Sequence, residues 1–184
     1  MRTSQLLTVP ALVATLLLSG CPEGEKPSAP APTDAPSAAD AGVIPAPMQA
    51  FKDDGAVAEL ALEGDDQMRF NKKRLTAKAG QMVRLTLKHV GTMPAQAMGH
   101  NVVILHPGDD IFEFGADVGK NGGSLENNYV PDAVRGRVVA FTPIVGGGET
   151  ATVEFKMPDK PGEYLFLCSF PGHFGQMNGV FVVE

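Results

Sequence analysis

Apolar and polar side chains alternate with a period of two through much of residues 54–184, and this pattern restricts the fold more than any other feature. The alternation is cleanest in 82–88 and in 150–157, where every second side chain is apolar. Glycine and proline clusters, such as 146–148, separate the alternating segments. Further strands are predicted at 56–62, 73–78, 100–105, 136–142, 162–168 and 179–183. Many short strands separated by turn signals predict an all-β sandwich.

One long stretch, roughly 110–134, interrupts the alternation. It is rich in glycine and asparagine. We expect a short helix within it, near 115–122.

The first twenty residues have the composition of a secretory signal peptide. Arg2 supplies a positive charge, and the apolar stretch 6–18 that follows is too short to span a bilayer comfortably. The sequence Leu-Ser-Gly-Cys at 18–21 resembles the bacterial lipobox, in which the signal is cut before a cysteine that is then lipidated. An ordinary signal peptide with a leftover cysteine is the alternative. The lipobox predicts an extracytoplasmic protein, anchored through lipid on Cys21 to the periplasmic side of a bacterial membrane or to the cell surface.

Residues 21–53 are predicted to be a linker that begins with the lipidated cysteine. Seven prolines lie among alanine, serine and acidic residues, and no apolar period is present. Such a segment cannot bury enough apolar surface to fold, and its prolines favour an extended conformation. The chain is therefore divided into a signal peptide (1–20), a linker (21–53) and one folded domain (54–184).

The charge of the processed chain excludes some classes of partner. Removal of Arg2 with the signal leaves fourteen basic and twenty-one acidic residues, a net charge of about −7. We therefore expect no nucleic-acid binding. Anionic lipid would also not attract this chain, so the lipid on Cys21 must provide the membrane contact.

Cys168 is the single cysteine of the predicted domain, and two other metal-binding side chains follow it closely. His173 comes five residues later and Met177 four residues after that. An unpaired thiol in an oxidising compartment is a hazard unless something occupies it. A thiolate, imidazoles and a weak axial thioether form an electron-transfer copper site. The alternatives are that Cys168 is a small buried apolar residue and that Met177 fills the core.

A second imidazole must come from another part of the chain. His100, at the start of a predicted strand, is the best candidate, and His89 and His106 are its competitors. Zinc rarely accepts a thioether, and iron–sulfur clusters need more cysteines. A Cys–His nucleophile pair would not explain Met177.

These residues resemble the azurins and auracyanins of the cupredoxin, or blue copper, family. The resemblance rests on CSFPGHFGQM at 168–177 and on MGHN at 98–101, extends through 64–71 and 146–149, and covers roughly 56–184. It implies a Greek-key β-sandwich of about eight strands with a short helical insertion. It also implies one type 1 copper ion that cycles between Cu(I) and Cu(II).

The resemblance implies a role for each residue of the site. The copper ligands would be His100, Cys168 and His173 in one plane, Met177 as a long axial ligand, and the carbonyl of Gly99 on the other side. Asn101 would brace the ligand loops, and its amide and that of Phe170 would tune the cysteine sulfur. His89 would lie near the site without being a ligand.

The chain departs from the azurin pattern at several positions. Ala58 and Gln81 stand where azurins have a disulfide, and the chain contains no tryptophan. Phe141 stands where azurins often have a second histidine. Gln176 replaces an apolar residue before the methionine, which makes the expected docking surface less apolar.

The expected function is single-electron transfer to and from redox proteins that dock transiently, with no small-molecule substrate and no enzymatic reaction. Electrons would pass through the outer edge of His173. An apolar patch around it is expected to contain Met68, Met93, Met98, Phe170 and Phe174. The alternative is a lipid-anchored carrier or store that delivers copper rather than electrons. A copper redox enzyme would need further histidine clusters, which four histidines cannot supply.

Overall fold

The computed structural model describes residues 56–184. The predicted signal peptide (1–20) and the linker that begins at Cys21 (21–53) lie outside the described residues, as does the start of the predicted domain at 54–55. The description below concerns the described part of the chain alone.

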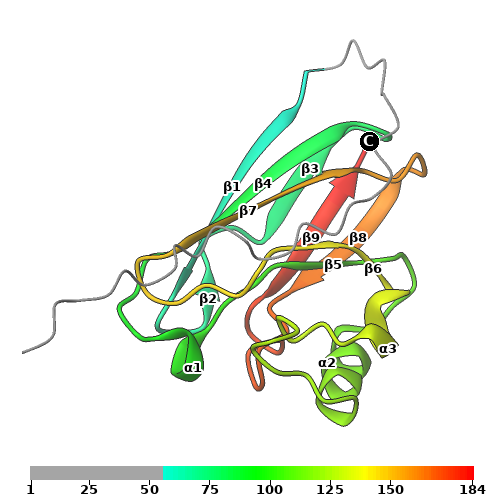
Figure 1. The fold of residues 1–184 in the computed structure, drawn as a ribbon. Helices are drawn as coiled ribbons and strands as arrows, with labels where there is room; N and C mark the ends of the chain where they lie inside the picture. Colours follow the sequence, from blue (N-terminus) through cyan, green and yellow to red (C-terminus); the bar gives the residue numbers. More distant parts are fainter. Residues whose placement is uncertain (1–55) are drawn as a thin grey trace, which may run out of the picture. The chain divides into compact units, whose positions relative to one another are not determined.

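Two β-sheets contain nine strands in this part of the chain, one more than the eight or so expected (Figure 1). The first sheet has the order β2 (Arg69–Phe70), β1 (Ala58–Asp65), β4 (Met82–His89) and β7 (Thr150–Lys156). The second has the order β3 (Arg74–Ala77), β9 (Asn178–Val183), β8 (Gly162–Leu167), β5 (Val103–Leu105) and β6 (Val138–Phe141). Both sheets are mixed, because β1 pairs with β4 and β3 with β9 in parallel while the other pairs are antiparallel. The predicted all-β sandwich is confirmed.

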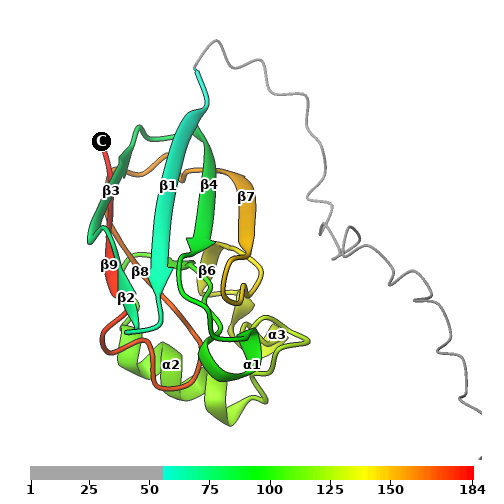
Figure 2. The same cartoon turned by 90° about the vertical axis from the view of Figure 1, so that its left-hand side faces the viewer.

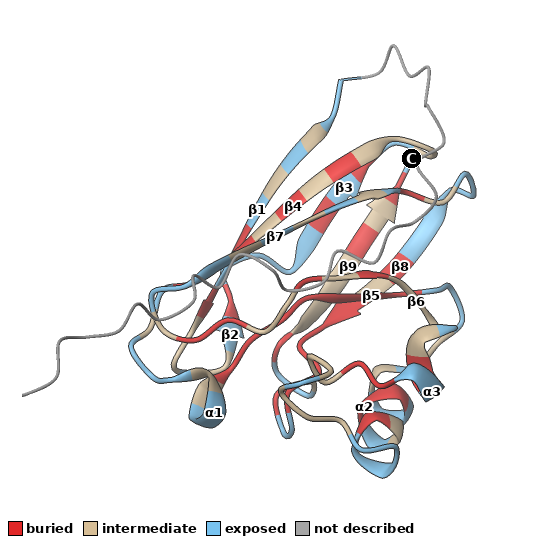
Figure 3. Ribbon diagram, viewed as in Figure 1, coloured by how far each residue is buried: buried red, intermediate tan, exposed pale blue. Residues whose placement is uncertain are grey.

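The alternating pattern places one face of each sheet in a shared core (Figure 3). In β4 the side chains of Val83, Leu85 and Leu87 are fully buried, whereas the intervening residues are not. They belong to the same apolar cluster as Phe166 of β8 and Phe181 of β9. Full burial of a large apolar side chain contributes about 1.5–3 kcal/mol, so this cluster holds the two sheets together.

Three helices lie at one end of the sandwich in both views (Figures 1 and 2). The longest, α2 (Ile111–Lys120), begins earlier than the helix expected near 115–122. The carboxylate of Asp110 caps it by accepting hydrogen bonds from the amides of Phe112 and Glu113. The shorter helices α1 (Ala95–Met98) and α3 (Asp132–Arg135) were not predicted.

The strand expected at 100–105 is shorter than predicted. Only β5 (Val103–Leu105) is a regular strand, and His100 instead forms an isolated bridge with Val145. The amide of Val102 bonds to the Thr142 side chain rather than to a ladder partner. The regular ladder is therefore interrupted at 101–102, next to His100.

A hydrogen bond lies near the position of the missing azurin disulfide. The Gln81 side chain donates to the carbonyl of Ala56, 2.9 Å away, and accepts from the amide of Lys78. Gln81 therefore ties the segment before β1 to the start of β4 without a covalent link.

Candidate metal centre

Cys168 follows directly after β8, with its thiol inside the apolar cluster between the sheets. Its amide donates to the carbonyl of Met177, 2.8 Å away. Burial raises the pKa of the thiol to about 12, although hydrogen bonds from the amides of Asn101 and Phe170 oppose that increase. Without a metal, the thiol is therefore neutral at pH 7.

His173 lies in the turn after Cys168, and its ring returns toward the sulfur. Its amide donates to the carbonyl of Phe170, and its Nδ1 lies 3.7 Å from Sγ of Cys168. The side chain is only 3 % exposed. Burial lowers the pKa of His173 to about 4, with smaller contributions from His100 and His89. The imidazole is therefore neutral at pH 7 and can offer a lone pair to a metal.

His100 contributes a second imidazole from a segment 68 residues before Cys168. Two backbone hydrogen bonds with Val145 fix its main chain. Its Nε2 lies 2.9 Å from the carbonyl of Asp65, which accepts a hydrogen bond from it. The proton is thus on Nε2, and Nδ1 has a free lone pair. Among residues 56–184, Nδ1 of His100 is the one buried side-chain nitrogen or oxygen with no hydrogen-bond partner.

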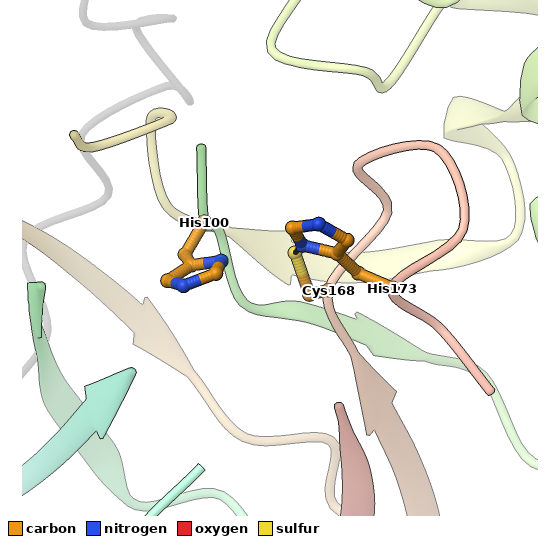
Figure 4. A group of neighbouring side chains, drawn as sticks. All are labelled: His100, Cys168 and His173. Atoms are coloured by element: carbon orange, nitrogen blue, oxygen red, sulfur yellow. Dashed lines mark hydrogen bonds between the residues drawn. The ribbon is translucent and has the colours of Figure 1, made fainter. Parts of the chain in front are cut away.

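These three side chains form one cluster (Figure 4). The ligand atoms of His100, Cys168 and His173 all lie within 4.8 Å of one another, and all three residues are buried. An unpartnered buried nitrogen is costly unless something binds it. One thiol and two imidazoles match the ligand set of a copper electron-transfer centre, so these residues fit that metal.

Met177 and Gly99 lie beside this cluster. The Met177 side chain is fully buried, and its methyl group lies near Gly64 of β1. A Cβ at Gly64 would lie 3.3 Å from that methyl carbon and 2.8 Å from the His100 ring, so only glycine leaves room for both side chains. The carbonyl of Gly99 lies 3.8 Å from Sγ of Cys168.

The sequence of this domain matches the copper binding proteins of the plastocyanin/azurin family over residues 57–184. The chain belongs to this family. It is 43 % identical over 124 residues to an azurin from Alcaligenes faecalis, which covers 66 % of this chain and 94 % of that azurin. Among solved structures, an auracyanin from Roseiflexus castenholzii superposes with a TM-score of 0.61 at 29 % identity, covering 71 % of this chain and 99 % of the auracyanin.

A longer relative shares the domain. Outer membrane protein H.8 of Neisseria meningitidis serogroup B is 42 % identical over 125 residues, which is 64 % of this chain. The chain spans 63 % of that protein's length. The family and these relatives confirm a cupredoxin domain with one type 1 copper, the cofactor expected from the sequence.

Asn101 joins three segments around the cupredoxin site. Its side-chain oxygen accepts from the amide of Ser169, and its side-chain nitrogen donates to the Ser169 hydroxyl and to the carbonyl of Asn128, each at 2.8 Å. Asn128 and Tyr129 both have positive φ angles, 55° and 53°, which are uncommon for residues other than glycine. The Tyr129 ring packs edge-on against Phe170 at 5.0 Å. Asn128 and Tyr129 therefore support one side of the ligand loop, which comprises residues 168–177.

The remaining histidines lie outside the ligand cluster. The rings of His89 and His100 stack with their centroids 4.3 Å apart, but both nitrogens of His89 already have hydrogen-bond partners. Its Nδ1 accepts from the amide of Gly91, and its Nε2 donates to the carbonyl of Met98. His106 is exposed.

The residues expected in the docking patch differ in exposure. Met93 is 37 % exposed, whereas Met68, Met98 and Phe174 are only partly exposed. Phe170 differs from the expectation because it is 8 % exposed, packed between Tyr129 and His173, and it adds little to the surface.

Phe112 of α2 is an exposed aromatic residue that sequence reasoning missed. It is 58 % exposed and packs edge-on against Phe174 at 6.0 Å. The helical spacing of the apolar residues that follow it is the sequence signal for its exposure. Phe114 and Val118 are buried four residues apart, which places Phe112 on the outer face.

Proposed function

We propose that the protein transfers single electrons through one type 1 copper ion. In this proposal His100, Cys168 and His173 would hold the copper strongly, and the Met177 thioether and the Gly99 carbonyl would contribute weakly. The unpartnered Nδ1 of His100, aimed at a buried thiol and a second imidazole, is the observation that carries this proposal. When bound, the copper ion supplies the one-electron chemistry by alternating between Cu(II) and Cu(I).

The protein's own residues keep the site rigid. The main chain of each strong ligand is fixed by backbone hydrogen bonds, from His100 to Val145, from Cys168 to Met177 and from His173 to Phe170. Ligands whose main chain is held in this way need little rearrangement when the charge of the site changes. This rigidity favours rapid electron exchange.

Burial of the three ligands also favours electron transfer over the alternative of a copper carrier or store. Metal delivery requires the ligands to open toward a recipient protein, and all three side chains are enclosed. Electron transfer requires only that a partner approach the edge of His173. Redox proteins, one donor and one acceptor, would dock briefly on Met93 and its partly exposed neighbours, since such encounters use small interfaces.

A visible spectrum of the copper-loaded protein tests this function. Charge transfer from the Cys168 thiolate to Cu(II) should produce an intense blue colour in the oxidised protein, and reduction should bleach it. Cys168→Ser should abolish the colour. A colourless copper complex, or a colour that survives this substitution, would refute the blue-copper assignment.

We further propose an extracytoplasmic location with a lipid anchor on Cys21. The lipobox-like sequence before Cys21 supports this anchor, and one relative bears the name of an outer membrane protein. None of the helices in the described part of the chain has the length and hydrophobicity needed to cross a bilayer. More than one lipid chain on Cys21 would give lasting attachment.

Membrane fractionation tests the anchor. Cys21→Ser should release the protein from membranes or block its processing, while leaving the copper spectrum unchanged. A variant that still sediments with membranes would contradict lipid attachment at this residue.

A further inference from the structure

Lys73 reaches the ligand loop from a distant part of the sequence. Its ammonium nitrogen lies 2.6 Å from the carbonyl oxygen of Gln176 and 3.0 Å from that of Asn178. These two carbonyls belong to the residues on either side of Met177. The lysine therefore binds the backbone on both sides of the proposed axial ligand.

The backbone of Met177 itself bonds within the ligand loop and not to Lys73. Its amide donates to the carbonyl of His173, and its carbonyl accepts from the amide of Cys168, each at 2.8 Å. Hydrogen bonds within the ligand loop thus hold Met177, whereas Lys73 holds the residues that flank it. The segment that carries the thioether is fixed from two sides.

The position of Lys73 is in turn fixed by the second sheet. Its carbonyl accepts from the amide of Val180 in β9, 2.9 Å away, and the next residue, Arg74, begins β3. A rigid main chain at the base of the side chain limits how far the ammonium group can move. Hydrogen bonds from an ammonium group are also stronger than those between neutral groups.

We propose that Lys73 is a positioning residue for the copper site. Its ammonium group holds the segment that carries Met177 and places a positive charge next to the ligand loop. The role of Met177 as a copper ligand comes from the proposed function, on which this inference rests. A nearby cation favours the less positive oxidation state, so Lys73 raises the reduction potential of the copper.

Lys72 provides a matched control. Its ammonium group also donates to one backbone carbonyl, that of Ala61 in β1, at 2.8 Å. Lys72→Met and Lys73→Met therefore remove the same charge and the same kind of bond from adjacent residues. Only the second substitution removes contacts with the ligand loop.

The first measurement needs no copper. In the full chain carrying Cys21→Ser, Cys168 is the sole thiol, and a thiol reagent can reach it only when the loop opens. Lys73→Met should speed labelling of the metal-free protein about tenfold, a change that corresponds to roughly 1.4 kcal/mol. Lys72→Met should label at the parent's rate. A labelling rate that stays constant in dilute urea shows that local opening, rather than global unfolding, exposes the thiol.

The second measurement is the reduction potential of the copper-loaded variants. Lys73→Met should lower the potential by more than Lys72→Met does. If the two variants agree in either the labelling rate or the potential, the proposal for Lys73 is overturned. Failure of the proposed function would instead appear as a protein without blue copper, and the labelling comparison would still decide the role of Lys73.

Discussion

The protonation state of Cys168 leads to a prediction about metal binding. Burial raises the pKa of the thiol to about 12 and lowers that of His173 to about 4, so both groups are neutral at pH 7. Metal binding needs the thiolate and therefore releases a proton. Titration of the metal-free protein with zinc, which does not oxidise thiols, should release about one proton per ion between pH 7 and pH 8.

The matched control is Cys168→Ser, which should bind zinc more weakly and release no proton from this position. Release of no proton from the parent protein would mean that the thiolate is already formed before the metal arrives. The fold would then stabilise the negative charge through the amides of Asn101 and Phe170 more than burial opposes it.

Met177 should adjust the reduction potential rather than retain the copper. A thioether stabilises soft Cu(I), whereas an amide oxygen is a harder donor that favours Cu(II). Met177→Gln should therefore bind copper and have a lower reduction potential, measured by voltammetry. Loss of copper from this variant would show that the axial role is assigned to the wrong residue.

The ligand cluster is easier to predict from sequence than its surroundings. Cys168, His173 and Met177 lie within ten residues, so their spacing alone indicates a shared site. His100 had to be chosen over His89 and His106, which its place at the start of a predicted strand and the resemblance to azurins both supported. Lys73 could not be found in this way, because it lies 103 residues from Gln176 and shows its role only when β3 pairs with β9.

At the level of secondary structure, α2 and the ligand loop touch through Gly115. A Cβ at this position would lie 2.5 Å from the Phe174 ring, closer than real contacts allow. Alanine normally stabilises a helix by about 1 kcal/mol relative to glycine. Gly115→Ala should nevertheless destabilise the metal-free protein by about 1–2 kcal/mol, because overpacking forces the ring to move. Urea unfolding measures this difference.

Gly119 lies on the same helix with open space around its Cβ position. Gly119→Ala should therefore stabilise the protein by about 0.5–1 kcal/mol. Equal effects of the two substitutions would mean that Phe174 does not rest on α2 in solution.

The strands of the core follow from the alternation, but the shorter elements do not. The pattern in 82–88 predicts β4 because Val83, Leu85 and Leu87 must share a face. Strand β2 has two residues and α1 has four, too few to establish any period. The sequence predicts too late a start for α2 because Asp110 fits a hydrophilic turn as well as it fits a helix cap.

Over the whole described domain, the outer face of the first sheet differs in charge from the end that carries the copper site. On β4, Arg84 pairs with Glu59 of β1 and Glu154 of β7, which makes this face of the first sheet charged. The loop before α1 exposes Met93 instead, and α2 exposes Phe112. A partner that avoids burying charge would therefore dock at the copper end, where the path to His173 is shortest.

Met93→Asp tests this docking surface. The Met93 amide bonds to Asp66 and its carbonyl to the amide of Gly147, so the substitution leaves the backbone held. A charge at the centre of an apolar contact must lose its water, which costs several kcal/mol if it stays unpaired. Electron self-exchange between two copies should slow at least about tenfold at fixed ionic strength, because each 1.4 kcal/mol is a factor of ten. The visible spectrum should not change.

Val57→Asp is the matched control, because Val57 is also an exposed apolar residue, at 43 %, and lies beyond the other end of β1. It adds the same charge to each copy and so corrects for general repulsion between two acidic proteins. Self-exchange in this variant should stay within about a factor of two of the parent's, since a single exposed charge far from the contact is largely screened. If both variants slow exchange equally, net charge rather than the Met93 surface controls the encounter, and electrons leave the protein by another face.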